Sequence, residues 1–394
     1  MKRILFVDHA SRILGGAEIN LIELLSAVSP SGGWPAACAC REGSQLSRAV
    51  GALGARQWDY GFGSALDEFR LVHRRCSPLS VGRAFRALHS ARRRLGEIMD
   101  EFRPNAVISC AAKDHFCAGP ACRRAGASSI WWVNDILSAD FFPWAARKAF
   151  VWRAKRHAAR LVVVSEFARR ALLEQGLPES LVTTIHNGLP LERYQRTSAE
   201  KFRGELGARL DEPLIGLVGR YVAWKGPAFF LRVAQAWVKT GAPGQFVLIG
   251  QAFNEDQAFE AELRRIIAEN NLGGRVRLAP FQPDIAPALS ALDVLMHTSL
   301  RPEPFGRVII EAMALGVPVI AARAGGVPEI ITDGVDGLLA EPGHLEEYRE
   351  RLERLLGSES LAAALSRAGQ ATVRARFTLD RVRSQFETLL AEIG

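Results

Sequence analysis

Residues 214–238 read LIGLVGRYVAWKGPAFFLRVAQAWV. The apolar run at 215–218 is typical of a buried strand, and apolar residues recur with helical period over 227–238. Gly219 and Gly226 lie in the loop between the two segments. The stretch therefore predicts a strand, a loop and a helix, which is the repeating unit of a parallel α/β sheet.

The same alternation extends along the chain in both directions. In the first half, the predicted strands are Arg3–Asp8, Pro35–Cys40, Asn105–Ala111, Ser129–Val133, Leu161–Ser165 and Val182–His186. In the second half, they are Leu214–Gly219, Phe246–Gly250, Val276–Ala279, Val294–Thr298 and Pro318–Ala321. Gly and Pro interrupt both periods at 188–190, and the polar stretch from there to Pro213 is the linker candidate. We therefore predict an α/β protein of two doubly wound, Rossmann-like domains that face a central cleft.

The length and composition of the chain fit this prediction. Its 394 residues are 48% hydrophobic and 23% charged, which is typical of a folded globular protein. No apolar run approaches the roughly 20 residues of a bilayer span, and Asp8-His9 ends the first run too early for a secretion signal. The six cysteines lack zinc-site spacing, so we expect reduced thiols, no structural metal and a cytoplasmic protein.

Positive charge is concentrated in the first half. The chain has a net charge of +8, and residues 70–160 hold 18 basic against 6 acidic residues. Such a surface attracts nucleic acid, anionic lipid or a phosphorylated substrate. A generally arginine-rich composition explains the same excess without any partner, since only 7 of the 50 basic residues are lysines.

Two loops carry residues that suit a phosphate. Gly15-Gly16 precedes a predicted helix, where backbone N–H groups and the helix dipole favour an anion, although the pair also fits a plain tight turn. After the strand at 215–218, Arg220 and Lys225 lie five residues apart and are able to bracket a diphosphate without Mg²⁺. The alternative is that these two side chains are solvated loop cations.

The stretch RPEPFGRVIIEAMA at 301–314 places two carboxylates near one helix start. Pro and Gly put Glu303 in a loop, and the run from Phe305 is expected to be helical, with its first N–H groups directed toward the ligand that Glu303 faces. Glu311 then lies one to two turns along this helix. Both carboxylates are able to accept hydrogen bonds from hydroxyls of one bound sugar. Alternatively, Glu311 is a buried residue that accepts a backbone N–H.

Several motifs together carry a family resemblance. They are Glu303-x7-Glu311, Gly15-Gly16-Ala17-Glu18, Gly219-Arg220-x4-Lys225-Gly226, the run from Gly325 to Leu339, Val162–Ser165 and His186-Asn187-Gly188. With these motifs the chain resembles family 4 of the retaining glycosyltransferases, over nearly its whole length and most strongly in the second half. The resemblance implies a GT-B fold with an acceptor-side domain at 1–190 and a nucleotide-sugar-binding domain at 191–376. A final helix at 377–394 would pack back on the first domain.

The resemblance also implies a nucleotide-diphosphate-sugar donor and transfer with retention at the anomeric carbon. Arg220 and Lys225 would hold the diphosphate, and Glu311 the ribose. Glu303 would hold the transferred sugar. The donor-binding residues carried over from the family are Gly15, Gly16, Arg220, Lys225, Pro304, Phe305, Gly306 and Glu311. No cofactor, metal or protein nucleophile is required, because catalysis rests on stabilising the leaving diphosphate.

One position departs from the family pattern. Members often carry His-Asp after the fifth strand, near the transferred sugar, whereas this chain has Asn134-Asp135. Asn134 is able to hydrogen-bond a sugar hydroxyl but does not titrate near neutrality. His115, after the fourth strand, either substitutes for the missing histidine in the cleft or caps a surface helix. The candidate catalytic residues are therefore Glu303, Asp135, Asn134 and His115.

Residues Val81–Phe102 predict an amphipathic helix. Its apolar stripe faces away from Arg83, Arg86, Arg93 and Arg94. This arginine-rich face is able to rest on anionic lipid and present a lipid-linked acceptor, but a core helix with a solvated face fits the pattern equally well. Aromatic and basic residues are not separated on the helical wheel of 141–156, so this segment is not counted as a second membrane helix.

The sequence therefore predicts a metal-independent, retaining hexosyltransferase that uses a UDP- or GDP-sugar. The expected acceptor is a hydroxyl of a glycan or lipid-linked molecule in cell-surface polysaccharide or glycolipid synthesis, in the cytoplasm or at the inner face of the membrane. A nucleotide-sugar epimerase of the same fold and a non-catalytic basic binding protein stay open as alternatives. Nucleic acid is not an expected partner, because no known nucleic-acid-binding motif is present.

Overall fold

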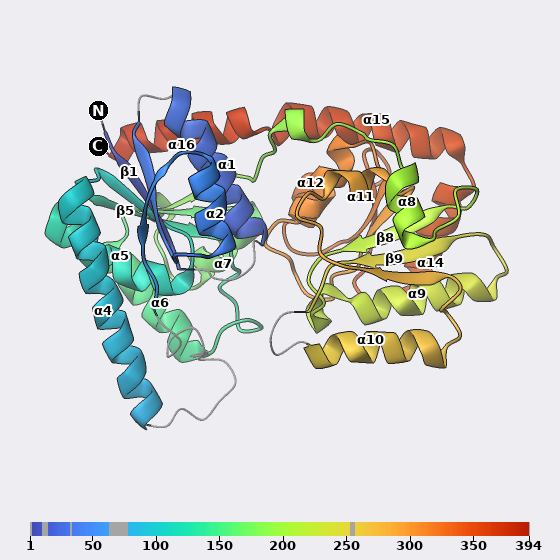
Figure 1. Cartoon of the computed structure of the whole chain (residues 1–394), viewed down its shortest axis with the longest axis horizontal. Coiled ribbons are helices and arrows are strands. Elements are labelled where there is room, and N and C mark those ends of the chain that lie inside the picture. Colours follow the sequence, from blue (N-terminus) through green and yellow to red (C-terminus); the bar gives the residue numbers. More distant parts are fainter. Residues whose placement is uncertain (1, 10–14, 32–33, 63–77, 253–256, 394) are drawn as a thin grey trace. The chain divides into compact units, whose positions relative to one another are not determined.

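The computed structural model describes residues 2–9, 15–31, 34–62, 78–252 and 257–393. The chain forms two compact units (Figure 1). Unit 1 comprises Met1–Gly188 together with Leu379–Gly394, and unit 2 comprises Leu189–Thr378. Each unit is a parallel sheet flanked by helices, so the predicted fold class of two doubly wound, Rossmann-like domains is confirmed.

The described part of unit 1 contains a seven-stranded parallel sheet. Its spatial order is β3 (Arg56–Asp59), β2 (Ala36–Cys40), β1 (Ile4–Asp8), β4 (Ala106–Ser109), β5 (Ser128–Val133), β6 (Arg160–Val163) and β7 (Val182–Thr184). All five residues of β1 are buried, because helices cover both faces of a parallel sheet. The chain order reverses between β1 and β4, and this switch point is where open α/β sheets bind ligands.

The helices of unit 1 come from both ends of the chain. They are α1 (Gly16–Ser31), α2 (Gln45–Ala52), α4 (Pro78–Phe102), α5 (Ala112–Ala125), α6 (Trp144–His157), α7 (Glu166–Glu174), the 3₁₀ turn η1 (Glu179–Leu181) and α16 (Leu379–Ile393). Helix α16 packs on this unit, where the ring of Phe386 lies 5.9 Å from the ring of Trp132 and Glu392 pairs with Arg160 at 3.3 Å.

The described part of unit 2 contains a six-stranded parallel sheet. Its order is β10 (Val276–Ala279), β9 (Gln245–Ile249), β8 (Leu214–Val218), β11 (Val294–His297), β12 (Val319–Ala322) and β13 (Leu338–Ala340). The helices are η2 (Leu191–Arg193), α8 (Glu200–Leu206), η3 (Ala223–Lys225), α9 (Pro227–Lys239), α10 (Gln257–Glu269), α11 (Ala286–Ser290), α12 (Arg307–Ala314), α13 (Val327–Ile330), α14 (Leu345–Leu356) and α15 (Glu359–Arg376). Here the switch point lies between β8 and β11.

Two strands were missed by the sequence patterns. Strand β3 is an edge strand whose four residues are exposed or half-buried, so it lacks the apolar run that marks a buried strand. Strand β13 has only three residues, which is too short for any periodicity. The predicted strands are present, although most end one or two residues earlier than predicted because the chain leaves the sheet for the loops that follow them.

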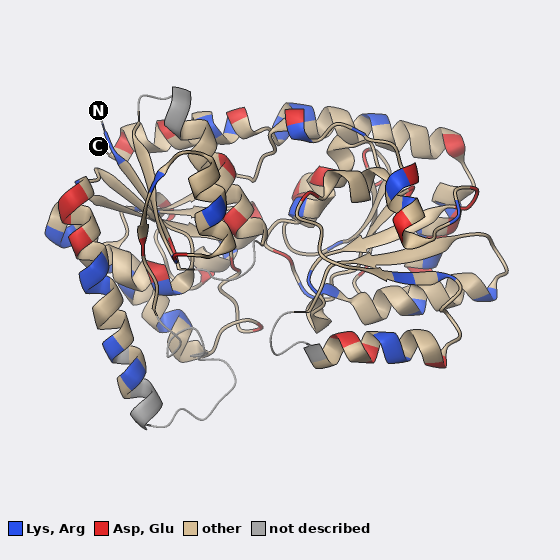
Figure 2. Cartoon of the chain, viewed as in Figure 1, with Lys and Arg blue, Asp and Glu red and all other residues tan. Residues whose placement is uncertain are grey.

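Helix α4 is the amphipathic helix predicted at 81–102. Its apolar stripe packs into the core of unit 1 through Ala91, Leu95, Ile98 and Met99, which are all buried. The side chains of Val81 and Phe85 lie outside the described residues. The apolar stripe is therefore used by the core, and the arginines at 83, 86, 93 and 94 are exposed. Figure 2 shows basic residues along this helix. Within the described ranges, none of the helices has the length and hydropathy needed to cross a bilayer.

Candidate functional site

The loops at the switch point of unit 2 carry most of the predicted donor-binding residues. The loop 219–226 follows β8, and the loop 298–306 follows the neighbouring strand β11. The backbone N–H of Leu300 donates to the carbonyl oxygen of Trp224 at 2.7 Å, and the hydroxyl of Thr298 donates to that of Gly226 at 3.1 Å. These bonds hold the two loops together, so Lys225 and Glu303 meet although they are far apart in the sequence.

Glu303 is the centre of a buried cluster of polar side chains. One carboxylate oxygen pairs with Lys225 Nζ. The other lies 2.5 Å from His297 Nε2 and accepts the hydroxyl of Ser299 at 2.9 Å. Burial alone would raise the pKa of Glu303, but Lys225 and His297 hold it well below its usual range. Glu303 is therefore a carboxylate at neutral pH.

His297 and Ser299 were missed by sequence reasoning. His297 is the last residue of β11 and Ser299 follows two residues later, on the strand end that points to the switch point. Polar residues at the carboxyl end of an otherwise apolar strand are the signal that could have identified them. The predicted strand Val294–Thr298 included His297 but gave it no role.

The backbone around Glu303 leaves no room for side chains at two glycines. Gly325 has a φ of +66°, and a Cβ there would lie 2.2 Å from the carbonyl oxygen of Glu303. The N–H of Gly326 donates to that same oxygen at 2.8 Å. Gly226 has a φ of +72°, and a Cβ would lie 2.1 Å from the carbonyl oxygen of Thr298. Only glycine fits at these close approaches.

The loop after Glu303 leads into α12. The helix begins at Arg307, two residues later than predicted, because Gly306 adopts a φ of +109° that is not helical. Phe305 is buried against Phe377, with their ring centroids 5.6 Å apart, whereas Pro304 is only half-buried. The start of α12 is thus fixed by a packed aromatic side chain, and its N-terminal dipole favours a negative charge nearby.

Glu311 is buried on α12. Its Oε1 accepts a hydrogen bond from Arg307 Nε at 2.8 Å and another from the hydroxyl of Tyr194 at 3.0 Å. Arg307 also donates to the Tyr194 oxygen at 3.2 Å. Side chains, and not a backbone N–H, therefore donate the hydrogen bonds to Glu311, so the alternative expectation for this residue is wrong.

The two predicted diphosphate cations have different surroundings. Arg220 is exposed in the loop after β8. Lys225 is largely buried, pairs with Glu303, and lies 4.8 Å from the centroid of the Trp224 ring. The alternative that both are solvated loop cations therefore fails for Lys225. Lys225 is held in place by the carboxylate of Glu303.

In unit 1, the Gly15-Gly16 turn is closed by a side chain. The N–H of Gly15 donates to Glu18 Oε2 at 2.7 Å, and α1 begins at Gly16. A Cβ on Gly15 would lie 2.9 Å from that oxygen. This is the reach-back by which a glutamate in the first turn satisfies an N-terminal N–H. Gly16 itself is exposed.

A buried Asp–His pair lies at the switch point of unit 1. His9 follows β1, and Asp114 lies in the first turn of α5, after the neighbouring strand β4. Asp114 Oδ2 accepts the backbone N–H of His9 at 3.1 Å and lies 2.9 Å from the ring Nδ1. Asp114 is fully buried, and the His9 side chain is 13% exposed.

This arrangement fixes the tautomer of His9. Because Asp114 Oδ2 already acts as an acceptor for the backbone N–H, the ring Nδ1 is assigned as a donor to it. In the neutral form of this tautomer, Nε2 is the ring nitrogen that carries the lone pair. Sequence reasoning used Asp8-His9 only to exclude a secretion signal. The signal for its role was the position of His9 directly after the first strand.

His115 is a core residue, which corrects both expectations for it. Its ring stacks on Trp131 at 5.0 Å with an interplanar angle of 4°, and the edge of Phe150 packs against it. Its Nδ1 forms a hydrogen bond of 2.7 Å with the hydroxyl of Ser109. Burial, helped by His9, lowers the pKa of His115 to about 3, so the ring is neutral. It is neither a cleft residue nor a surface helix cap.

Asn134 and Asp135 follow β5. Asn134 is half-buried, its Nδ2 donates to the carbonyl oxygen of Cys110 at 3.4 Å, and it lines a small hollow shared with Asn20 of α1. Asp135 is exposed. The structure thus places Asn134 beside the switch-point strands β1 and β4, whereas Asp135 lies at the surface.

One group of potential metal ligands lies in the described residues. Asp8, His9 and Asp114 each offer a ligand atom, and these atoms lie within 4.8 Å of one another. His9 Nδ1 is already bonded to Asp114, so this cluster is used as a hydrogen-bonded pair in the structure. The expected absence of a metal remains a prediction.

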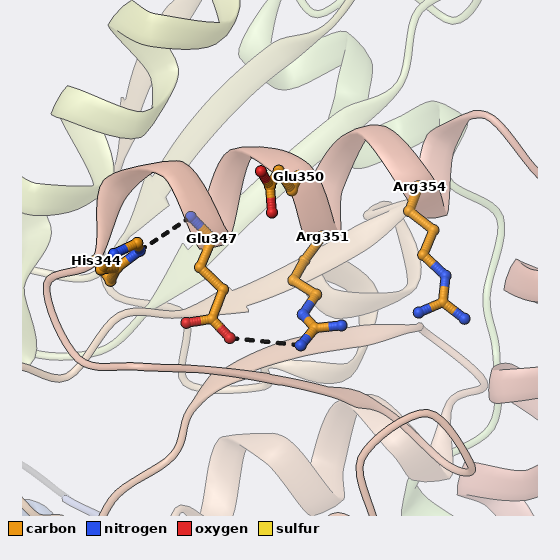
Figure 3. Close-up of a pocket in the computed structure, with 5 residues that line it drawn as sticks. All are labelled: His344, Glu347, Glu350, Arg351 and Arg354. Atoms are coloured by element: carbon orange, nitrogen blue, oxygen red, sulfur yellow. Dashed lines mark hydrogen bonds and ion pairs between the residues drawn. The ribbon is translucent and has the colours of Figure 1, made fainter.

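A separate hollow lies along α14, and none of the five residues that line it is a predicted site residue (Figure 3). His344 Nδ1 caps the helix by accepting the N–H of Glu347 at 3.3 Å. Arg351 pairs with Glu347 at 3.4 Å. The paired charges along one helix face are typical of a solvated helix, so this hollow is not a site candidate.

Two family models match consecutive parts of the chain. Residues 14–193 match the model described as Glycosyltransferase Family 4, and residues 198–372 match the model described as Glycosyl transferases group 1. The division between the two matches falls in the predicted linker.

Several proteins of known identity are similar to the chain. It is 30% identical over 190 residues to the lipopolysaccharide core biosynthesis glycosyltransferase LpsE of Rhizobium meliloti (strain 1021), covering 48% of this chain and 53% of that protein. It is 27% identical over 256 residues to the alpha-D-kanosaminyltransferase of Streptomyces kanamyceticus, covering 64% of each. The alignments thus span about half to two thirds of these relatives.

Solved structures match over the full length. The crystal structure of Anabaena Alr3699/HepE in complex with UDP and glucose superposes with a TM-score of 0.85 and 25% sequence identity, covering 99% of this chain and 100% of that one. The same protein with UDP-glucose gives the same TM-score.

Proposed function

The chain belongs to the GT-B glycosyltransferases, and we propose from this premise that it transfers a hexose from a nucleotide-diphosphate sugar to a hydroxyl of a glycan or lipid-linked acceptor. The proposed reaction retains the configuration at the anomeric carbon and requires no metal. The acceptor belongs to cell-surface polysaccharide or glycolipid synthesis. The relative LpsE, a lipopolysaccharide core biosynthesis enzyme, supports this class of product.

The observation that carries the proposal is the cluster around Glu303. A buried carboxylate beside a lysine and a histidine, next to a helix N-terminus, offers acceptors for sugar hydroxyls and positive charge for a phosphate in one place. The similar Anabaena protein binds UDP-glucose, so a UDP-sugar is the donor to test before a GDP-sugar.

The proposed donor contacts follow from the chemistry of each group. Arg220 and Lys225 hold the diphosphate, with Lys225 exchanging its Glu303 partner for a phosphate oxygen. Glu311 accepts a ribose hydroxyl, and Gly16 keeps the donor-binding role that the family resemblance implies. Glu303, freed from Lys225 but still held by His297 and Ser299, accepts a hydroxyl of the transferred sugar.

The proposed chemical step requires no protein nucleophile. The acceptor oxygen bonds to the anomeric carbon as the bond from that carbon to the phosphate oxygen breaks, and the acceptor proton passes to the departing phosphate oxygen. The amides of Phe305 and Gly306 and the cations Arg220 and Lys225 stabilise the growing charge of the nucleoside diphosphate. The transition state resembles an oxocarbenium ion.

On unit 1, we propose that His9 orients the acceptor. Its Nε2 accepts a hydrogen bond from an acceptor hydroxyl, while Asp114 keeps the ring in the required tautomer. Asn134 contributes a further amide contact to a sugar hydroxyl, and Asp135 is retained as an exposed candidate. His115 has no part in this proposal.

The first experiment is a titration of the purified protein with UDP-, GDP- and ADP-sugars in EDTA, followed by thermal shift and by release of the nucleoside diphosphate. We expect one donor to raise the melting temperature, and the Glu303→Gln variant to lose most of that rise. A matched change on the exposed surface of α14, Glu350→Gln, should leave the rise intact. Failure of every donor to stabilise the wild type would contradict the proposal.

The His9–Asp114 pair also favours a second candidate, a nucleotide-sugar epimerase, because such an enzyme needs an acid or base beside the sugar. The two functions give different products without an acceptor. An epimerase converts the donor into a second nucleotide sugar, whereas a transferase releases the nucleoside diphosphate slowly or not at all. Chromatography of the donor after incubation distinguishes them.

A further inference from the structure

Helix α6 presents an unusual combination of residues to the solvent. Its buried residues, Phe150, Val151 and Ala154, pack into the core of unit 1. The exposed residues are Trp144, Ala145, Lys148, Ala149, Trp152, Lys155 and Arg156. At about 100° per residue, these seven positions occupy a single arc of about 140°, opposite the buried residues. The exposed side of the helix is therefore one continuous face.

The two tryptophans are the strongest feature of this face. Trp144 is 66% exposed and Trp152 is 60% exposed, which is comparable to Leu210 at 62% although the indole ring is much larger. A tryptophan on a solvated helix loses the benefit of burying its ring. Two of them, about two turns apart on one face, indicate a surface that is covered in the working state of the protein.

The remaining side chains of the face are alanines and cations. Lys148, Lys155 and Arg156 have no carboxylate partner among the described residues, and α6 contains no Asp or Glu. Arg153 lies 5.7 Å from the Trp152 ring centroid, and Arg123 donates to the carbonyl oxygen of Arg156 at 3.1 Å. Burial and the surrounding arginines lower the pKa of His157, which reports the same positive field.

Helix α4 shows what an ordinary basic helix of this protein looks like. It carries more arginines than α6, but Arg93 and Arg94 pair with Glu97, and Asp100 pairs with Arg124. Figure 2 shows Asp and Glu among the Lys and Arg of α4. Among the residues that the structure describes, α4 exposes no tryptophan. The two basic helices therefore differ in both charge pairing and aromatic content.

We propose that the exposed face of α6 docks on the surface of an anionic lipid bilayer. Tryptophan rings favour the boundary between headgroups and acyl chains, and lysine and arginine are attracted to anionic headgroups. The alanines between them let the helix lie close to the surface. The face combines two exposed indoles with cations and holds no carboxylate, which is the composition of a helix that lies at the boundary of an anionic bilayer, so a bilayer is the occupant that we propose.

Docking of α6 on a bilayer does not require transfer activity. Only the idea that docking brings the enzyme to a lipid-linked acceptor rests on the proposed function. A bilayer against α6 would bring unit 1 to the place where such an acceptor lies. The helical wheel of 141–156 did not separate aromatic from basic residues, because both classes share the exposed face of this helix. A membrane-surface helix of this kind has no purely apolar stripe to detect.

The test is co-sedimentation of the full chain, without donor, with vesicles of phosphatidylcholine alone or with one third phosphatidylglycerol. We expect binding to the anionic vesicles that is at least about tenfold tighter and that weakens with salt. The double variant Trp144→Ser/Trp152→Ser should weaken it at least about fivefold, and Lys148→Gln/Lys155→Gln/Arg156→Gln should do the same. The matched control is Arg83→Gln/Arg86→Gln/Arg93→Gln on α4, which should change binding less than about twofold.

Each other outcome overturns the proposal. If wild type does not sediment with anionic vesicles at low salt, α6 is not a bilayer surface. If the α4 variant loses as much binding as the α6 charge variant, attraction is a property of the whole basic unit. If the tryptophan variant binds like wild type and polyphosphate competes fully with vesicles, the face binds a soluble polyanion. Melting temperatures of all variants check that the exposed changes leave the fold intact.

Discussion

The two units place polar groups at the same point of their sheets but prepare them differently. In unit 2, the loops after β8 and β11 bring Lys225 against Glu303, so opposite charges neutralise each other in a buried cluster. In unit 1, β1 and β4 bring His9 against Asp114, so a buried carboxylate orients a single imidazole. The two units therefore share the sheet topology but differ in the charged groups at the switch point, which are a Lys–Glu pair in unit 2 and a His–Asp pair in unit 1.

This difference matches what each half is proposed to bind. A diphosphate requires cations, and in the proposed function Lys225 is held by Glu303 before the donor arrives and then exchanges this carboxylate for a phosphate oxygen. An acceptor hydroxyl requires a hydrogen-bond acceptor, and this is the role proposed for Nε2 of His9, whose Nδ1 is bonded to Asp114. The switch point thus defines where a ligand binds, and the residues placed there decide its class.

The largest effect is expected from Glu303. Glu303→Gln keeps the shape of the side chain but removes the charge that holds Lys225, so both the sugar contact and the lysine position are lost. We expect kcat to fall by about 10²–10³-fold in a transfer assay. Glu350→Gln is the control and should retain wild-type kcat. If the Glu303→Gln enzyme had wild-type kcat, the buried cluster around Glu303 would have no part in the reaction.

The second-largest effect is expected from Arg220, which is exposed and lies outside the buried cluster around Glu303. Arg220→Ala should weaken donor binding by roughly 2–3 kcal/mol, which is the loss of a charge-assisted contact to the diphosphate. Calorimetric titration with the donor measures this directly. Arg232→Ala, on the neighbouring helix α9, is a matched control that should bind normally. Equal affinity of wild type and Arg220→Ala would place the diphosphate elsewhere.

The sequence predicted the unit 2 loops better than the unit 1 site. Pro, Gly and the short strands at 214–219 and 294–298 fix where the chain leaves the sheet, so Glu303 and Lys225 could be placed on neighbouring loops. In Lys113-Asp114-His115, the wrong residue was chosen. Adjacent residues of a helix point about 100° apart. Which one faces His9 depends on Trp131 and Phe150, which come from other elements.

A third effect tests the unit 1 pair. His9→Gln should lower kcat for transfer by about tenfold to a hundredfold while leaving the KM for the donor unchanged, because it acts on the acceptor. Asp114→Asn should act in the same direction, since an amide no longer enforces the tautomer of His9. If either variant changes the donor KM as much as kcat, the two units do not divide donor and acceptor as proposed.

The smallest effect on activity is expected at His115, next to Asp114. His115→Phe keeps the ring contact with Trp131, and Ser109 keeps its hydrogen bond to the carbonyl oxygen of Ile130 at 3.4 Å. At neutral pH, kcat should therefore change less than about threefold, whereas His9→Gln loses far more. A large loss of kcat in His115→Phe would show that the buried His115 is needed for catalysis. It would contradict the assignment of the acceptor contact to His9 and Asp114 rather than to His115.

The stability of the fold should depend on pH through His115. In the unfolded chain His115 binds a proton near the ordinary histidine pKa of 6.5, but in the fold burial lowers the pKa to about 3. Between these values the unfolded state binds more protons, so wild-type stability falls as the pH falls, by up to about 1.4 kcal/mol per pH unit. His115→Phe removes this proton uptake, so its free energy of unfolding should decline less steeply from pH 6 to pH 4 in urea titrations. Parallel curves for the two proteins would show that His115 is protonated in the fold, and therefore that it is not sealed in the core.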